Sequence, residues 1–357
     1  MRILIQALAT ATPPLYVTQR EAFAFFDAQL AMAPEERELF RRILLDGPVR
    51  GRYIGMDHPE EALETDPDRL VARFGKFGRL MAAVAARAAM TQAGCAPADI
   101  GGVVVNTCTG YLCPGLSSYV AEDLGLDPGV KVMDLMGMGC GAALPNLECA
   151  AGIVARGAAK PILSIAVEVC SATIFLGAEP DLIVSNCIFG DGASAALVNG
   201  DGHDGDARPA GDGLVQILDF ESGIFPAHRE QLRYRTEQGR LRNVLSPRVP
   251  VLGAMTIMHV VERLLTRNGL SPDRIAWWAV HAGGTAVLKQ VGKKLGLNDE
   301  ALRFSHEVFR EYGNMSSPTV MFVLKKIIDQ GRPKPGEPGL LLSFGAGFAA
   351  FGALVVF

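Results

Sequence analysis

Short apolar runs alternate with amphipathic segments through the first half of the chain. The apolar runs predict buried strands at Gly102–Asn106, Lys131–Leu135, Ile162–Glu168 and residues 193–199. Apolar positions at helical spacing between them predict helices over residues 80–93, Leu116–Leu124 and 142–156. The N-terminal residues 1–7 form a short apolar run that predicts a first strand. Strands alternating with helices of this length predict an α/β sheet covered on both faces.

The second half of the chain repeats this plan. Its pattern predicts helices over residues 251–268, Thr285–Leu295 and 318–329, and strands at residues 276–280, 340–342 and 352–357. A polar loop rich in glycine and aspartate separates the halves at residues 199–212. Phe189-Gly-Asp-Gly-Ala-Ser-Ala-Ala-Leu-Val198 also resembles Phe344-Gly-Ala-Gly-Phe-Ala-Ala-Phe-Gly-Ala-Leu-Val355. We therefore predict a duplicated half-domain, with one half at residues 1–200 and the other at 211–357.

The composition narrows the function classes. The chain has 357 residues, of which 49% are hydrophobic and 20% charged, and its formal net charge is −4. These values exclude disorder and argue against nucleic-acid binding, and they favour a large interior or a large subunit interface. Its seven cysteines include no Cys-x-x-Cys pair, so we expect no structural zinc and no disulfide framework. Reduced thiols are typical of a cytoplasmic protein.

The uncharged stretch at residues 339–357 is the one candidate for a membrane span by length. Four glycines and a serine fall inside it, two of these glycines and the serine at Ser343-Phe-Gly-Ala-Gly347, and no basic anchor follows. This pattern favours two buried strands around a glycine turn, and we expect no membrane span.

Cys140 lies where a predicted strand ends in glycines and a helix begins at once. A thiol at a helix N-terminus is favoured as thiolate by the helix dipole and the free amide groups. The alternative interpretation is a small apolar residue packed in a strand-to-helix turn, and the residues alone leave both open.

Two further residues suit chemistry around such a thiol. The predicted strand at residues 276–280 delivers His281 directly to Ala282-Gly283-Gly284, and strand ends of this kind carry catalytic groups in α/β sheets. Asn314 lies in Glu311-Tyr-Gly-Asn-Met-Ser-Ser317 ahead of a helix, which by itself is typical of a turn with an N-cap. Asn314 becomes functional only if it faces the same cavity as Cys140 and His281.

Taken together, these motifs resemble the type III polyketide synthases, which are relatives of chalcone synthase in the thiolase-fold superfamily. The resemblance covers nearly the whole chain and rests on Gly139-Cys140, Phe189-Gly-Asp-Gly-Ala, His281-Ala-Gly-Gly, Glu311-Tyr-Gly-Asn-Met-Ser-Ser and Phe344-Gly-Ala-Gly. It implies a five-layered αβαβα thiolase-like fold built from two duplicated halves. It also implies a homodimer with no permanently bound cofactor and no metal, which uses coenzyme A (CoA) thioesters as substrates.

The resemblance assigns roles to the residues of these motifs. Cys140 would take a starter acyl group from CoA as a thioester. His281 and Asn314 would stabilise the carbonyl oxygens of the thioesters, and His281 would keep Cys140 ionised as a thiolate–imidazolium pair. Phe189 would separate the entry tunnel from the cavity. Decarboxylation builds negative charge on a thioester oxygen, which two preorganised hydrogen-bond donors stabilise. An aromatic surface that excludes water favours the neutral product over the charged carboxylate.

Other positions follow from the same local matches. The cavity would be lined by Cys108, Thr109, Cys170, Thr173, Ser316 and Phe344, while Cys113 would reach across the dimer interface. Cys108 and Cys170 could equally be packing thiols. Arg42 matches one of three basic positions that plant relatives use on the CoA phosphates, with Arg41 or Arg50 as substitutes. The sequence departs from the family at His281-Ala-Gly-Gly and Ser343-Phe-Gly-Ala-Gly, where the usual motifs are His-Pro-Gly-Gly and Gly-Phe-Gly-Pro-Gly.

The bacterial style of Met138-Gly-Cys-Gly-Ala-Ala143 favours a fatty or small acyl starter, and hence an alkylpyrone or alkylresorcinol product. The alternative within the family uses malonyl-CoA alone and gives tetrahydroxynaphthalene or 3,5-dihydroxyphenylacetyl-CoA. Outside the family, the alternatives are a ketoacyl-ACP synthase III, a hydroxymethylglutaryl-CoA synthase and an inactive homologue that acts as a scaffold.

Overall fold

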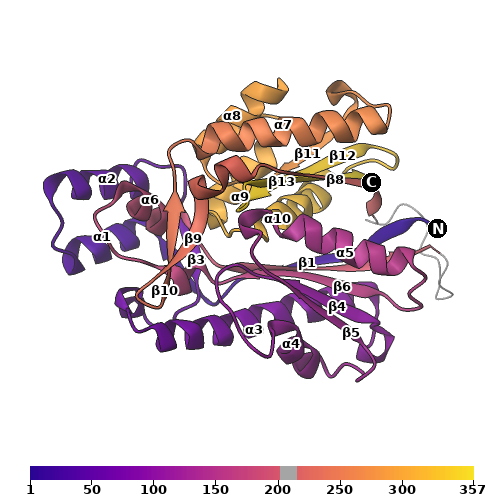
Figure 1. The fold of residues 1–357 in the computed structure, drawn as a ribbon, viewed down its shortest axis with the longest axis horizontal. Coiled ribbons are helices and arrows are strands. Elements are labelled where there is room, and N and C mark those ends of the chain that lie inside the picture. Colours follow the sequence, from indigo (N-terminus) through magenta and orange to yellow (C-terminus); the bar gives the residue numbers. More distant parts are fainter. Residues whose placement is uncertain (202–214) are drawn as a thin grey trace.

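The computed structural model describes residues 1–201 and 215–357 (Figure 1). Its strands are β1 (Ile3–Ala11), β2 (Leu15–Thr18), β3 (Gly51–Ile54), β4 (Gly102–Asn106), β5 (Lys131–Leu135), β6 (Ile162–Glu168), β7 (Gly192–Gly200), β8 (Val215–Ile224), β9 (Leu232–Glu237), β10 (Arg240–Leu245), β11 (Trp277–Val280), β12 (Pro338–Gly345) and β13 (Ala349–Val356). Its helices are α1 (Gln19–Gln29), α2 (Pro34–Leu44), α3 (Pro67–Ala93), α4 (Leu116–Leu124), α5 (Ala143–Ala155), α6 (Pro180–Ile188), α7 (Val249–Arg267), α8 (Thr285–Leu295), α9 (Arg303–Tyr312) and α10 (Thr319–Lys326).

The strand order confirms the duplication. One mixed sheet runs β11-β12-β13-β8-β1-β7-β6-β4-β5. In the first half β4 is parallel to β6, which is antiparallel to β7, which is antiparallel to β1. In the second half β11, β12, β13 and β8 follow each other with the same directions. The two similar glycine-containing segments lead into β7 and β13, which occupy equivalent places.

The halves meet where β1 pairs with β8, at Ile3–Ile217, Leu4–Gln216 and Ile5–Val215. The polar loop predicted between them at residues 199–212 lies for the most part outside the described residues. The division at residues 200 and 211 therefore stays a prediction.

The helices and the two parts of the sheet form five layers (Figure 1). Helices α5 and α10 lie in the middle, and one apolar cluster joins them to strands of both halves. Helices α3 and α4 cover the outer face of the first half, while α7 and α8 cover the outer face of the second half. The predicted thiolase-like architecture is confirmed.

Local signals place most of these elements. Asp66 caps the start of α3, where its side chain accepts a hydrogen bond from the amide of Asp68. Gly94 ends α3 in the left-handed region, with φ of 68°. The predicted helix at residues 80–93 is therefore the second half of a longer helix. The helix predicted at 318–329 is α-helical only to Lys326 and then continues as a π-helical turn.

One prediction about burial is wrong. The strand β5 forms as expected, but it is the outer strand of the sheet, and its first four residues are exposed. Its apolar side chains suggested an interior position because the sequence does not distinguish burial inside one chain from burial against another surface.

The uncharged stretch at residues 339–357 forms β12 and β13, as predicted, and these are buried strands of the sheet. Among the described residues, α7 is the one helix long and apolar enough to cross a membrane, and more than half of it is buried within the fold. It covers the outer face of the second half and packs against β13 and β8.

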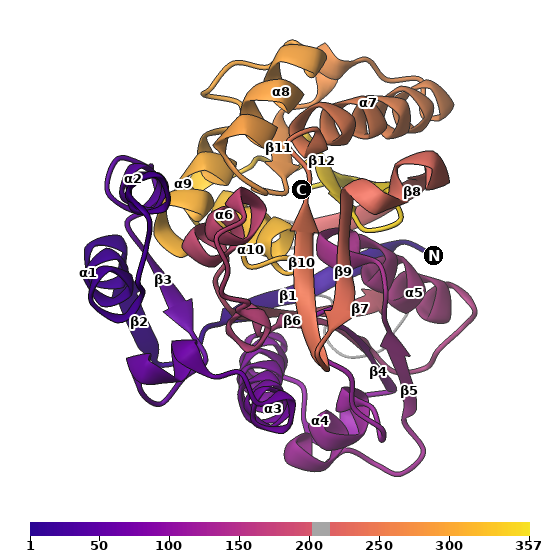
Figure 2. The same cartoon turned by 60° about the vertical axis from the view of Figure 1, so that its left-hand side comes forward.

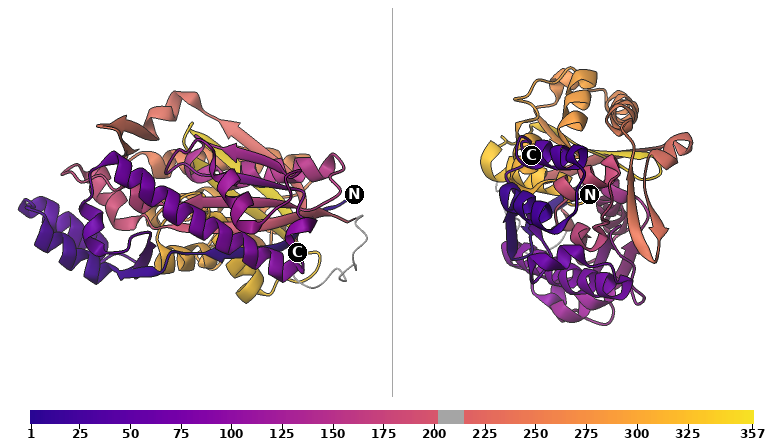
Figure 3. Two further views of the ribbon diagram at one scale, coloured as in Figure 1. Left: turned by 90° about the horizontal axis from the view of Figure 1, so that it is seen from below. Right: turned by 90° about the vertical axis from the view of Figure 1, so that its left-hand side faces the viewer.

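A smaller cap lies at one end of the molecule, far from both chain termini (Figures 1 and 3). It contains α1, α2, the β2–β3 pair and α6. The β9–β10 hairpin runs along the same side as α6 (Figure 2). This cap and hairpin enclose the end of the sheet at which the sequence-predicted residues converge.

Candidate active site

Cys140 lies in a tight turn, Gly139–Gly141, between β5 and α5. Gly139 has φ of 57°, a conformation that favours glycine. The turn is braced by the opposite half of the chain. A Cβ atom on Gly345 would lie 2.2 Å from the carbonyl oxygen of Met138 and 3.0 Å from the amide nitrogen of Cys140. Only glycine permits this approach, so the closing loop of the second half fixes the thiol of the first.

Ser316 connects the thiol to two neighbours. Its hydroxyl donates to the sulfur of Cys140 at 3.3 Å and lies 3.4 Å from the sulfur of Cys108. Its φ of 60° is unusual for a residue with a side chain. Backbone strain of this kind is typical of functional sites.

Asn314 joins this cluster to the loop that carries His281. Its side-chain oxygen accepts a hydrogen bond from the amide of Ser316 at 2.8 Å, and its Nδ2 donates to the carbonyl of Gly283 at 3.3 Å. The Nδ2 group is thus held toward the histidine loop by a long hydrogen bond that a substrate oxygen can replace. A chain of hydrogen bonds thus links Asn314 through Ser316 to Cys140 and through Gly283 to the loop that follows His281. That the three side chains face one cavity stays a prediction.

His281 is 1% exposed at the end of β11. Its amide donates to the carbonyl of Leu342 at 2.8 Å, and its ring meets the edge of the Phe344 ring at a centroid distance of 5.9 Å. Phe344 in turn stacks on Phe348. The ring is therefore held by aromatic packing, and its Nδ1 atom is buried without a partner among the described residues.

The electrostatics differ from the expected thiolate–imidazolium pair. Burial raises the pKa of Cys140 to about 12, an effect that the Ser316 hydroxyl opposes. Burial lowers the pKa of His281 to about 4. No hydrogen bond joins the two side chains in the described part of the chain. Both shifts favour the neutral forms of the thiol and the imidazole.

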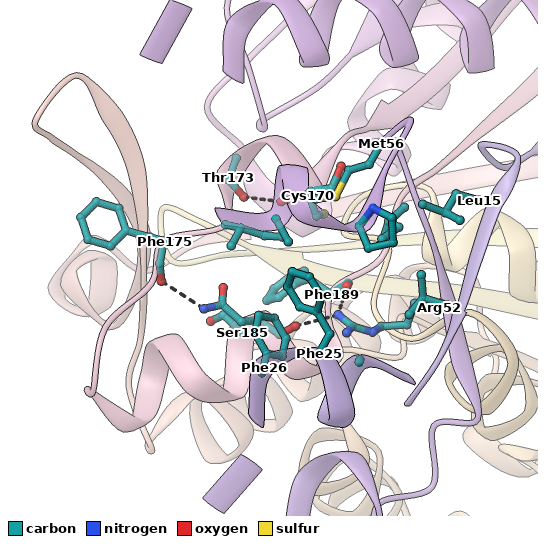
Figure 4. Close-up of a pocket in the computed structure, with 18 of the residues that line it drawn as sticks. Leu15, Phe25, Phe26, Arg52, Met56, Cys170, Thr173, Phe175, Ser185 and Phe189 are labelled. Carbon is teal, nitrogen blue, oxygen red and sulfur yellow. Dashed lines mark hydrogen bonds between the residues drawn. The ribbon is translucent and has the colours of Figure 1, made fainter. Parts of the chain in front are cut away.

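Phe189 lies beside Asn314. The two residues form an isolated parallel bridge, in which the amide of Asn314 donates to Ile188 at 2.8 Å and the amide of Gly190 donates to Asn314 at 3.0 Å. Phe189 also lines a cavity of about 360 Å³ (Figure 4). The structure thus places all four predicted catalytic residues on connected segments.

That cavity is mostly apolar and lies between α1, α6 and the turn Cys170–Thr173 (Figure 4). Cys170 and Thr173 line it as predicted, together with aromatic residues that include Phe25, Phe26 and Phe175. A second cavity of about 500 Å³ is lined by Cys108, Thr109 and Gly139. Small side chains predicted to shape the site therefore face two neighbouring spaces.

Two residues of the site escaped sequence analysis. Tyr234 lines both cavities, and its hydroxyl lies 3.2 Å from that of Thr173. Glu168 is fully buried and accepts hydrogen bonds from the hydroxyls of Thr107, Thr109 and Ser317 and from the amide of Cys108. Burial raises the pKa of Glu168. Its place at the end of β6, next to Val169 and Cys170, was a usable signal, whereas nothing local marks Tyr234.

The remaining predicted residues lie farther out. Cys113 is exposed on the loop before α4 and lines neither cavity. Arg42 and Arg50 are exposed on and after α2. Arg41 is already paired with Glu38 and Asp46, so it is the poorest of the three for binding phosphate. Among the described residues no cluster of side chains is suited to hold a metal ion.

Comparison with known proteins identifies the family. Residues 221–356 match the model for the C-terminal domain of chalcone and stilbene synthases, and residues 54–217 match that for FAE1/type III polyketide synthase-like proteins. A 3,5-dihydroxyphenylacetyl-CoA synthase from Streptomyces toyocaensis is 33% identical over 88% of this chain and 82% of its own length. The chain belongs to the type III polyketide synthase family.

Other members of the family are similar over nearly the full length. A 1,3,6,8-tetrahydroxynaphthalene synthase from Streptomyces peucetius subsp. caesius is 30% identical over 97% of this chain and 91% of its own. An alpha-pyrone synthesis polyketide synthase-like protein from Mycobacterium tuberculosis is 26% identical over 98% and 90%. Among solved structures, PKS-I from the brown alga Ectocarpus siliculosus has a TM-score of 0.89 at 26% identity, over 99% of this chain and 98% of that one. The chain is therefore an acyltransferase-type condensing enzyme of this family.

Proposed function

We propose that this polyketide synthase loads an acyl-CoA starter on Cys140, extends it with malonyl-CoA and releases a cyclised alkylpyrone or alkylresorcinol. The observation that carries the proposal is the set of contacts Cys140–Ser316–Asn314–Gly283, which gathers a thiol, an amide and the histidine loop. Asn314 also pairs with Phe189, which lines the large apolar cavity.

The loading step needs a base and an oxyanion donor. The sulfur of Cys140 attacks the thioester carbonyl while its proton passes to His281, and CoA leaves after it takes up that proton. The tetrahedral oxyanion is stabilised by Asn314 Nδ2 and the protonated imidazole. Preorganised donors of this kind supply a large share of the rate enhancement in such sites.

Extension uses the same donors. The carboxylate of malonyl-CoA leaves as CO₂, and the electron pair of the broken carbon–carbon bond forms an enolate on the thioester oxygen, which Asn314 and His281 stabilise. The enolate carbon then attacks the acyl thioester on Cys140, and the cysteine sulfur leaves. Phe189 supplies a dry surface at which the charged carboxylate is disfavoured relative to neutral CO₂.

The acyl starter is supported by the chemistry of the 360 Å³ cavity. Its walls include Phe25, Phe26, Ile54, Met56 and Leu182, which suit an alkyl chain. The second candidate uses malonyl-CoA alone, and it is supported by similarity to the 3,5-dihydroxyphenylacetyl-CoA and tetrahydroxynaphthalene synthases.

The test is mass spectrometry of products from malonyl-CoA with a panel of acyl-CoA starters of increasing chain length. We expect pyrones or resorcinols that carry the starter alkyl group, and an acylated Cys140 before malonyl-CoA is added. Products built from malonyl units alone, whatever starter is present, would establish the second candidate. Cys140→Ala is the control for every product, because it removes the attachment point.

We also propose a homodimer in the cytoplasm. The exposed strand β5 and the segments beside it present Val132, Met133, Met136 and Tyr111 to solvent, and Met136 and Tyr111 also line the 500 Å³ cavity. An apolar sheet edge of this kind is typical of an interface. All seven cysteines are unpaired, which agrees with a reducing compartment. Analytical ultracentrifugation should show a dimer, and Met133→Arg should shift it to monomer.

CoA thioesters are the expected substrates, with no resident cofactor. We propose Arg42 as a phosphate contact, since it has no ion pair among the described residues, whereas Arg41 has two. Arg42→Ala should raise the KM for CoA thioesters and leave kcat unchanged, because the phosphates lie far from the reacting carbons.

A further inference from the structure

Arg52 is a buried cation whose partners are all neutral oxygens. It lies in β3 and is 6% exposed. One guanidinium nitrogen donates to the main-chain carbonyls of Asn186 at 2.7 Å and Phe189 at 2.6 Å, and Nε donates to the side chain of Gln19 at 3.0 Å. Burial lowers the pKa of Arg52. Keeping the guanidinium charged at this place therefore carries a desolvation cost that a surface arginine does not have.

The two carbonyls belong to the end of α6. The last carbonyls of a helix have no partners within the helix and carry its negative dipole end. Arg52 satisfies two of these carbonyls, and Gln19 donates to a third, that of Cys187, at 2.9 Å. A buried arginine and a buried glutamine therefore cap the C-terminus of α6 from outside the helix.

The capped helix end leads directly into the active site. Phe189 follows α6 and pairs with Asn314, which carries the amide donor. A Cβ atom on Gly313 would lie 3.1 Å from Cγ of Arg52, so the arginine stem also packs under the residue before Asn314. Figure 4 shows Arg52 bonded to the main chain beside Phe189. Arg52 thus touches both segments whose pairing sets the distance between the aromatic wall and the amide.

We propose that Arg52 is a positioning residue, which fixes Phe189 and Asn314 relative to each other for the decarboxylation of malonyl-CoA. This inference rests on the proposed function of these two residues. Arg52 does not touch the reacting atoms. Its effect passes through the main-chain carbonyl of Phe189 and the packing beneath Gly313, and misplacement of reacting groups by about 1 Å costs on the order of a hundredfold in rate.

The test measures CO₂ release from malonyl-CoA by Arg52→Gln and by Arg52→Lys. We expect kcat to fall about tenfold or more in the glutamine variant while KM changes little, because the variant disturbs the reacting end and leaves the CoA contacts intact. The lysine variant keeps the charge and one donor toward the carbonyls, so it should recover part of kcat. An unchanged kcat in Arg52→Gln overturns the proposal.

The matched control is Arg73→Gln. Arg73 is also 6% exposed, and it also donates to main-chain carbonyls, those of Ser171 and Glu61. It therefore reproduces the loss of a buried arginine without contact with Phe189 or Gly313. Equal losses of kcat in the Arg52 and Arg73 variants, at equal losses of thermal stability, would show a general structural role and overturn the proposal.

A double-mutant cycle separates positioning from stability. In a Phe189→Ala background, Arg52→Gln should lower kcat clearly less than in the unmodified protein, because one of the two groups that Arg52 positions is already absent and only its effect on Asn314 is left. The full tenfold effect in that background would exclude action through Phe189. If Arg52→Gln does not fold, the cycle is run with Arg52→Lys, which keeps a cation at this place but loses the planar guanidinium that bonds both carbonyls and Gln19.

The outcomes for the proposed function are distinct. If the unmodified protein releases no CO₂ from malonyl-CoA, the proposed function fails. If it releases CO₂ and the Arg52 variants retain full kcat, only the positioning role fails.

Discussion

The hydroxyl of Ser316 donates a hydrogen bond to the sulfur of Cys140 at 3.3 Å, and it opposes the rise in thiol pKa that burial causes. Ser316→Ala removes this donor and should raise the pKa of Cys140 further. We expect alkylation of Cys140 by iodoacetamide at pH 8 to slow by about three- to tenfold, because only the thiolate reacts. Ser118→Ala, at an exposed serine on α4, is the control. An unchanged alkylation rate in Ser316→Ala would show that the Ser316 hydroxyl does not influence the pKa of the thiol.

Asn314 Nδ2 is the donor best placed to meet an enolate oxygen. Asn314→Ala should lower kcat for CO₂ release by about a hundredfold, the scale measured for loss of one oxyanion donor. Transfer of an acyl group to Cys140, followed by intact mass, should also slow, because the same Nδ2 stabilises the tetrahedral oxyanion of the loading step. Asn268→Ala, half-buried at the end of α7, is the matched amide control. An unchanged rate of CO₂ release in Asn314→Ala would contradict the role of Asn314 as a donor.

Asp191 is fully buried and accepts hydrogen bonds from the amides of Gly55 and Ser171 and from the Ser171 hydroxyl. Burial raises its pKa from 3.8 to about 6. The folded state therefore binds this proton more tightly than the unfolded state does. Stability from this group is present below pH 4 and is lost as the pH rises through about 6, by about 3 kcal/mol in all.

Urea unfolding of Asp191→Asn at pH 4.5 and pH 7 checks this sign. The variant cannot titrate, so its free energy of unfolding should change less between the two pH values than that of the parent protein. It should also be less stable overall, because an amide cannot accept from all three donors. An identical pH dependence in both proteins would assign the titration to another group, such as Glu168.

Tyr234 stands between the two cavities, with its hydroxyl 3.2 Å from that of Thr173. Tyr234→Ala should join the two spaces and shift the product distribution toward longer chains, as measured by mass spectrometry with one fixed starter. Tyr234→Phe keeps the ring and should keep the distribution. If the alanine variant makes the same products in the same ratio, Tyr234 does not limit chain length.

Local sequence signals predicted most strands and helices of the sheet and three residues of the candidate site. Glycines at turns and short apolar strands are local features, so Cys140, His281 and Asn314 could each be placed at the end of an element before any contact was known. Their convergence depends on contacts between the two halves, such as Gly345 against Cys140, which no local pattern encodes. The resemblance to a family supplied that step.

The residues that escaped prediction share a physical cause. Arg52, Glu168 and Tyr234 make their contacts with segments distant in the chain, and only Glu168, at the end of β6, carries a local signal. The prediction that β5 is buried was wrong for a different reason. Apolar composition does not say whether the same chain or another molecule covers a strand.

The equivalence of the two halves extends to their central helices. Helix α5 precedes β6 and helix α10 precedes β12, so the turn that holds Cys140 and the turn that holds Asn314 and Ser316 occupy corresponding places. The Ser316–Cys140 hydrogen bond therefore joins corresponding turns of the two halves. Two identical halves would bring identical groups to this contact. A thiol can meet a hydroxyl and an amide there only because the two turns carry different residues, a cysteine in one and an asparagine and a serine in the other.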